Sequence, residues 1–138
     1  MEIQELNFGP FVMKTKCEQS IIDDLLLAGS KLKNKYNHKL ASIGIDLWIN
    51  YMRPGDFNPI HTHGGAYSFV LFLDVPEVLR KEQRNHTGTT VGPGELMFEY
   101  AQQARPRWAT TGFTISPQPG DFIIFPALLQ HWVVPFRS

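Results

Sequence analysis

Short apolar segments separated by glycine and proline turns make up most of the chain after residue 43. Segments of this length are typical of strands and short for helices. They cover residues 44–52, 67–75, 95–100, 112–116, 122–126 and 130–136, and residues 57–63 predict a further strand or a strand-like entry. Many short strands joined by turns such as RPGD at 53–56 and PQPGD at 117–121 predict an all-β sandwich or barrel.

The stretches outside these segments show other patterns. Residues 6–13 predict a short strand or extended arm, and residues 18–36 carry apolar side chains at helical spacing. We therefore expect one N-terminal helix at about 18–36, followed by a barrel from about 44 to 138. The polar, glycine-containing stretch at 77–94 predicts a mobile loop, and 101–111 predicts a second loop.

Size and composition limit the classes of protein to which this chain can belong. Its 138 residues suit a single domain, 1–138, and a formal net charge of zero does not indicate a nucleic-acid partner. The single cysteine, Cys17, excludes an internal disulfide. The N-terminus lacks the features of a signal peptide, and no apolar stretch has the length of a membrane span. We expect a soluble, cytoplasmic protein without a membrane partner, and a homodimer is left open.

The histidines indicate a metal site. His61 and His63 form an H-T-H motif on a predicted extended segment, where side chains two residues apart point to the same face. Two imidazoles placed in this way can reach one ion at about 2.0–2.1 Å. His131 follows the apolar strand at 122–126, and an early and a late strand can be neighbours in a barrel. A histidine pair without a ligand is the alternative, but similar glycine turns precede both segments. They favour one divalent metal bound by His61, His63 and His131.

Three segments of the chain resemble one known family. They are WINYMRPGDFNPIHTH at 48–63, the apolar strand at 67–75, and PGDFIIFPALLQHWVVP at 119–135. Their order is similar to that of the 2-oxoglutarate/Fe(II)-dependent oxygenases, in particular the short prolyl-hydroxylase-like proteins of phages and marine bacteria. The resemblance implies a double-stranded β-helix, which is a jelly-roll, cupin-like barrel. It also implies Fe(II) and 2-oxoglutarate as cofactors and hydroxylation of an unidentified small-molecule or peptide substrate. His61 matches the first metal ligand of the family, and His131 matches the distal ligand.

The metal ligands depart from the family's pattern at one position. His63 stands where the family has an aspartate or glutamate, so an ion together with its protein ligands would have a net charge one unit more positive than in the family. Three histidines also suit Zn or Ni, which are therefore alternatives to Fe(II). A carboxylate from Asp56, Asp74, Glu95 or Glu99 is conceivable, but none of these residues has the spacing of the motif.

The residue that would bind 2-oxoglutarate is the second departure. The family places an arginine or lysine on the strand after the distal histidine, and Arg137 is the only basic residue between His131 and Ser138. Arg137 is therefore a candidate, and a continuation of the chain beyond Ser138 is the other place for this residue. Tyr51, Arg53 and Tyr67 are further candidates for contacts with the cosubstrate.

Two other hypotheses stay open. The spacing of Gly55, His61 and His63 also resembles the first metal-binding motif of the cupins, although the glutamate expected after H-x-H is absent. The chain would then be a cupin-type metal enzyme that does not use 2-oxoglutarate. The third hypothesis is a non-catalytic jelly-roll protein with a binding or structural role.

Overall fold

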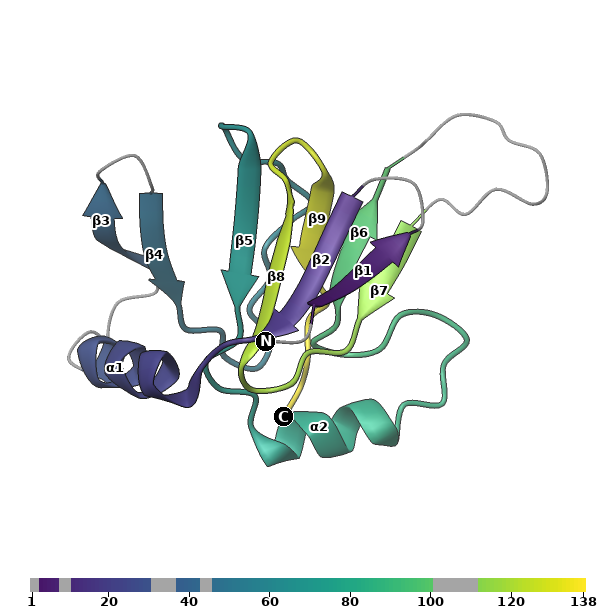
Figure 1. The fold of residues 1–138 in the computed structure, drawn as a ribbon. Coiled ribbons are helices and arrows are strands. Elements are labelled where there is room, and N and C mark those ends of the chain that lie inside the picture. The colour runs from purple at the N-terminus through teal and green to yellow at the C-terminus, as the bar shows by residue number, and fades with distance from the viewer. Residues whose placement is uncertain (1–2, 8–10, 31–36, 43–45, 101–111) are drawn as a thin grey trace.

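The computed structural model describes residues 3–7, 11–30, 37–42, 46–100 and 112–138 (Figure 1). The strands among them are β1 (Ile3–Asn7), β2 (Phe11–Lys16), β3 (Asn37–Ser42), β4 (Asp46–Asn50), β5 (Tyr67–Leu71), β6 (Leu96–Glu99), β7 (Gly112–Ile115), β8 (Asp121–Pro126) and β9 (Gln130–Val133). The helices are α1 (Gln19–Ser30) and α2 (Glu77–Arg84). The described part of the chain is therefore mainly β, as predicted. Neither of its helices has the length and hydropathy that a membrane crossing needs.

The described strands pair antiparallel in three sheets. One sheet has the order β1-β2-β8-β5, a second has the order β7-β6-β9, and β3 pairs with β4. The pairings of β8 with β2 and of β9 with β6 join strands that are far apart in the sequence. Because β8 lies between β2 and β5, this late strand holds early parts of the chain in one sheet.

A core of apolar side chains joins the two larger sheets. Burial alternates along β6 and β8, so every second side chain of these strands points to the interior. The rings of Phe98 in β6 and Phe125 in β8 pack edge to face, with centroids 4.9 Å apart. The buried cluster comprises Val12, Leu96, Phe98, Ile115, Ile123, Phe125 and Leu129. Burial of one such side chain contributes about 1.5–3 kcal/mol, so this cluster is the main stabilising contact between the sheets.

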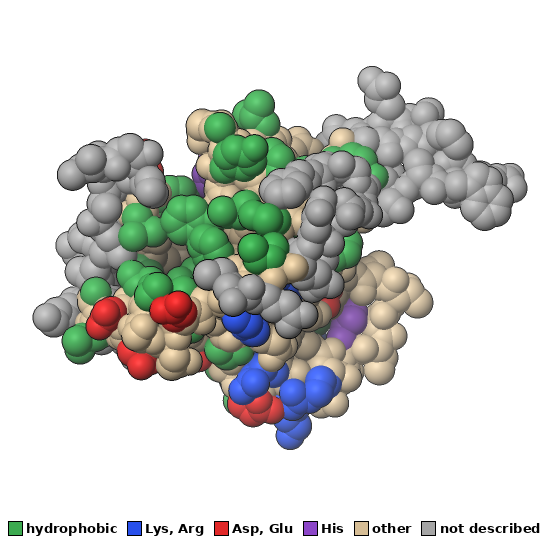
Figure 2. All heavy atoms as spheres, viewed as in Figure 1, with side chains coloured by type: hydrophobic (Ala, Val, Ile, Leu, Met, Phe, Trp, Pro, Cys, Tyr) green, Lys and Arg blue, Asp and Glu red, His purple; other side chains and the backbone are tan. Residues whose placement is uncertain are grey.

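The outer face of the first sheet is also apolar. The register places Phe69 of β5 opposite Ile124 of β8, which in turn lies opposite Met13 of β2. These side chains are half-buried. Figure 2 shows hydrophobic side chains gathered over β5, β8 and β2 on this face. Apolar residues on both faces explain why β8 reads as a continuous apolar run rather than as an alternating one.

The N-terminal region differs in part from the prediction. Residues 6–13, predicted as one short strand or extended arm, include the end of β1 and the start of β2, so strand structure is confirmed but belongs to two strands that pair antiparallel. The predicted helix at 18–36 is present as α1, which spans Gln19–Ser30, and residues 31–36 lie outside the described residues. The strand β3 was not predicted.

A second helix, α2, occupies part of the predicted loop at 77–94, so the expectation of a single helix is wrong. Glu77 in the first turn binds Arg80 at 2.8 Å and Arg84 at 2.6 Å. The negative charge at the start and the positive charge in the last turn also suit the helix dipole. Leu79 is the buried residue of this helix, so the apolar stripe that predicts an amphipathic helix is lacking. The second predicted loop, at 101–111, lies outside the described residues.

Residues 57–63, predicted as a strand or a strand-like entry, do not form a regular strand. Within the described residues, the only β-type pairing of this segment is an isolated antiparallel bridge between His61 and His131. Pro59 has no amide hydrogen to donate to a ladder, which accounts for the lack of a longer strand. The flanking turns agree with the prediction, because Gly55 and Gly120 both have a positive φ, +84° and +82°.

A buried carboxylate links the start of β8 to β2. Asp121 is fully buried, and its oxygens lie 2.8 Å from Nζ of Lys14 and 2.6 Å from Nζ of Lys16. It also accepts a hydrogen bond from the amide of Gln118 at 2.9 Å. Burial by itself raises the pKa of Asp121, but the hydrogen bonds from Lys14 and Lys16 outweigh burial and hold this pKa below its ordinary value. Asp121 is therefore ionised in the folded protein.

We expect Asp121→Asn to lower the free energy of unfolding by about 2–4 kcal/mol, because it leaves two ammonium groups beside a buried neutral amide. Lys16→Met is the matched control. The Lys16 side chain is 60% exposed, so its loss should cost less than about 1 kcal/mol. Urea denaturation measures both changes. Equal losses in the two variants would contradict a dominant role for the buried carboxylate.

Candidate metal centre

Backbone hydrogen bonds bring the first and the last of the three histidines together. The amide of His61 donates to the carbonyl of His131, and the amide of His131 donates to the carbonyl of His61, both at 3.1 Å. Antiparallel residues paired in this way lie directly opposite each other, and their side chains project from the same face. The amide of His63 donates to the carbonyl of Ala127 at 2.9 Å. The H-T-H segment therefore lies along the connection between β8 and β9.

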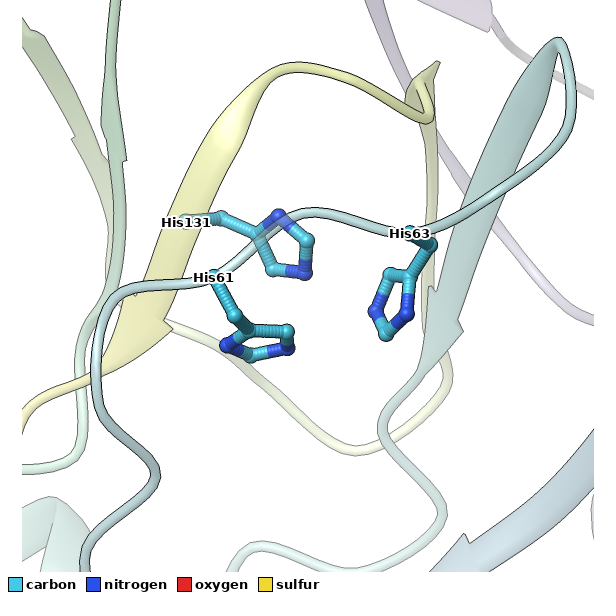
Figure 3. A group of neighbouring side chains, drawn as sticks. All are labelled: His61, His63 and His131. Atoms are coloured by element: carbon cyan, nitrogen blue, oxygen red, sulfur yellow. The ribbon is translucent and has the colours of Figure 1, made fainter.

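The three imidazoles point toward one another (Figure 3). One ligand nitrogen from each of His61, His63 and His131 lies within 4.8 Å of the other two. The convergence predicted from the sequence is thus confirmed. Ligands about 2.1 Å from one ion are about 3 Å apart in octahedral geometry, so small rotations of the rings would place all three nitrogens around one ion.

Hydrogen bonds to backbone carbonyls orient two of the rings. Nδ1 of His61 lies 2.8 Å from the carbonyl oxygen of Pro59, and Nδ1 of His131 lies 2.8 Å from that of Leu129. A carbonyl oxygen can only accept, so each Nδ1 carries the hydrogen and each Nε2 keeps a free lone pair. This is the tautomer and the kind of anchor that metal-binding histidines have in proteins.

Burial favours the neutral form of two of the histidines. Burial is the largest of the effects that lower the pKa of His131 to about 4, although the hydrogen bond to Leu129 acts in the opposite direction. Burial and the neighbouring His61 also lower the pKa of His63 below its ordinary value. At neutral pH, His131 and His63 therefore carry no proton that a metal would have to displace.

Aromatic rings lie beside two of the histidines. The ring of Phe125 lies 4.7 Å from that of His131, and the ring of Phe98 lies 6.2 Å away, measured between centroids. Trp48 of β4 packs on the ring of His63 with centroids 5.3 Å apart. No functional role was assigned to Trp48 from the sequence. Its contact with His63 was missed, because nothing in the spacing shows that β4 lies beside the H-T-H segment.

Within the described residues, the cluster of side chains that could bind a metal ion contains no carboxylate. Asp56 accepts a hydrogen bond in its own turn, and Glu95 accepts one from a serine hydroxyl at 2.5 Å. Glu99 follows the residue opposite His131 in the register of β6 and β9, so its side chain points to the other face of the sheet. Asp74 is exposed. The structure does not bring these carboxylates to the histidines.

The four residues expected to bind a cosubstrate lie in different places. Tyr67 begins β5 and is 66% exposed. It follows Ala66, whose carbonyl accepts the amide of Ala127, so it lies near the connection that binds His63. Arg137 is exposed, and its amide donates to the carboxylate of Glu82 in α2.

Tyr51 and Arg53 belong to the segment that follows β4. Tyr51 is half-buried and Arg53 is exposed. The amide of Gly55 in the same turn donates to the carbonyl of Phe136 at 2.9 Å, so this turn and Arg137 are close in space. Phe136 is five residues after His131 and thus up to roughly 17 Å from it along an extended chain.

Residues 46–138 match the model of a protein family described as "Putative 2OG-Fe(II) oxygenase". The match covers more than half of the chain and includes all three histidines, so the chain belongs to this family. The resemblance seen in the sequence is thereby confirmed, and the family places the protein, at a coarse level, among the oxidoreductases. No curated protein and no solved structure matches the chain.

The low pKa of His131 predicts a pH dependence of stability in the metal-free protein. Its folded pKa of about 4 lies below the ordinary value of 6.5. Between these values the unfolded chain binds more protons, so the free energy of unfolding should fall as the pH drops through this range. After allowance for solvent screening, we expect a loss of about 1–2 kcal/mol between pH 7.5 and pH 5.

Urea denaturation in the presence of a chelator measures this loss. His131→Gln is the control, because glutamine does not titrate and should remove the part of the pH dependence that His131 causes. An identical pH dependence in the wild type and in His131→Gln would contradict the assignment.

Proposed function

We propose that His61, His63 and His131 bind Fe(II) and that the protein is a 2-oxoglutarate-dependent dioxygenase that hydroxylates a small-molecule or peptide substrate. The single observation that carries this proposal is the convergence of three imidazoles from two distant segments. Membership of the oxygenase family supports it.

The donor atoms fit a catalytic metal ion. Imidazole nitrogens suit Fe(II), Zn and Ni, and the hydrogen bonds to Pro59 and Leu129 leave Nε2 of His61 and His131 free to bind. A structural zinc site is usually closed by four protein ligands. Three ligands leave positions open for a cosubstrate, so this donor set favours a catalytic ion over a structural one.

The proposed fold is a double-stranded β-helix. The sheets β1-β2-β8-β5 and β7-β6-β9 share one core, which the ring contact between Phe98 and Phe125 illustrates. His131 lies next to Phe125 and thus at one end of this core. This arrangement supports a barrel with the metal site at its mouth.

The residues around the site would have distinct roles in the reaction. His61 and His131 are held in the tautomer that offers Nε2, and Phe98 and Phe125 keep water away from the ring of His131. Fe(II) together with 2-oxoglutarate and O₂ would supply the oxidant for a C–H bond. Because imidazole ligands would not compensate the charge of a bound Fe(II) ion, the ion would favour an anionic cosubstrate.

Tyr67 is the best placed of the four candidate residues for binding this cosubstrate. Its neighbour Ala66 is linked through Ala127 to His63. Tyr51, Arg53 and Arg137 remain candidates for its distal carboxylate. The turn that holds Arg53 and the segment that holds Arg137 meet at the hydrogen bond between Gly55 and Phe136, which would gather positive charge at one place.

A zinc or nickel site of cupin type, without 2-oxoglutarate, is the second candidate. The observation that favours it is the absence of a carboxylate from the cluster within the described residues. A donor set of three histidines is found in catalytic zinc sites. A non-catalytic jelly-roll protein with a metal of structural importance is the third candidate.

Replacement of His63 separates these candidates. If the site is that of an oxygenase, His63→Asp should keep or raise Fe(II)-dependent turnover of 2-oxoglutarate, because it restores the family's carboxylate ligand and its negative charge. If the site is built for three histidines, the same change should weaken metal binding, since a nitrogen ligand is lost. Calorimetric titration with Fe(II) without oxygen, followed by a decarboxylation assay, measures both properties.

His131→Ala is the control for this experiment. It removes a ligand under every hypothesis and should weaken metal binding at least about 100-fold. If His63→Asp bound no metal and gave no turnover, the oxygenase proposal would have to be abandoned.

A further inference from the structure

The three histidines of the metal site are not held in the same way. Backbone carbonyls anchor the rings of His61 and His131 through Nδ1, each at 2.8 Å. Among the described residues no hydrogen bond holds the ring of His63. Apart from the other two histidines, the ring that packs on His63 is that of Trp48, with centroids 5.3 Å apart and planes inclined by 56°. The orientation of His63 thus depends on a packing contact.

Trp48 comes from a part of the fold that is otherwise separate from the two larger sheets. It lies in β4, which pairs with β3, and within the described residues these two strands form their own sheet. Trp48 is half-buried and lies opposite Lys39 of β3. Its contact with His63 therefore connects the β3–β4 sheet directly to the metal centre. Figure 1 shows this sheet beside β5, whose first residue follows the H-T-H segment closely.

We propose that Trp48 is a positioning residue for the metal centre: it holds the imidazole of His63 in the orientation that binds the ion, and metal binding in turn steadies the β3–β4 sheet. This inference rests on the proposed function, because it requires that the three histidines bind a metal. In this proposal Trp48 neither binds the ion nor serves only to pack the core. It acts on the ion through His63.

The contribution of Trp48 to metal binding follows from the different ways in which the three rings are held. A ligand that is free to rotate loses conformational entropy when it binds an ion, and a partner that fixes its ring in advance reduces this loss. Loss of such a partner typically weakens metal binding about 10–100-fold. Because linkage is reciprocal, the bound ion must stabilise the contact between His63 and Trp48 by the same factor.

Titration with Co(II), monitored by its visible absorption, tests the role of Trp48. We expect Trp48→Leu to weaken Co(II) binding by about 10-fold and to change the absorption spectrum, because His63 no longer holds one orientation. Trp48→Phe keeps an aromatic ring at this position and should restore most of the affinity and the spectrum. A purely structural role for Trp48 would not alter the spectrum of the bound ion.

Trp132→Leu is the matched control. Trp132 follows the ligand His131 in β9 and lies opposite Met97, so its side chain points to the other face of the sheet. Its loss removes a half-buried tryptophan next to a ligand without touching the contact with His63. Affinity and spectrum should stay at the wild-type values.

Hydrogen exchange in the wild type provides a second measurement, which does not depend on the folding of a variant. Addition of Co(II) should slow the exchange of the amides of β4, and this effect should disappear in Trp48→Leu. If Co(II) binds the wild type but exchange in β4 does not change, or if Trp48→Leu binds Co(II) like the wild type, the inference is overturned. If the wild type binds no Co(II), the proposed function itself fails.

Discussion

The backbone pairing of His61 with His131 is the constraint on which the site depends. Its hydrogen bonds set the register between the H-T-H segment and the strand β9. Once this register is set, the antiparallel geometry places both side chains on one face, and the extended chain places His63 on the same side. A shift of one residue would turn His131 away from the other two rings. The arrangement of the three histidines therefore depends on this pairing.

The core explains why this pairing occurs where it does. Phe125 of β8 is buried against Phe98 of β6, and the chain then turns into β9 with His131 on the same inner side. The apolar rings that stabilise the two sheets are thus also the surroundings of His131, and they keep its imidazole neutral. Stability of the core and availability of the nitrogen lone pair arise from the same contacts.

The cluster of three histidines was easier to predict from the sequence than the helices were. The i, i+2 spacing of His61 and His63 needs only an extended chain, and the turn before β8 predicted the route to His131. The helix α2 was missed because Leu79 is its buried residue, and ion pairs rather than an apolar stripe support it. The role of Trp48 could not be predicted from the sequence either, because the sequence of a strand does not show which other segment of the chain packs against it.

The charge of the site follows from where the acidic side chains lie. Glu99 points to the opposite face from His131, Glu95 binds a serine hydroxyl, and the buried Asp121 is neutralised by lysines of β2. An ion held by three neutral imidazoles would thus keep its full positive charge beside apolar rings, where electrostatic interactions are strong. The compensating negative charge then has to come from a bound ligand. Under the proposed function a 2-oxo acid would supply it, so His63 would transfer the negative charge from the protein to the cosubstrate, and metal affinity would then depend on that cosubstrate.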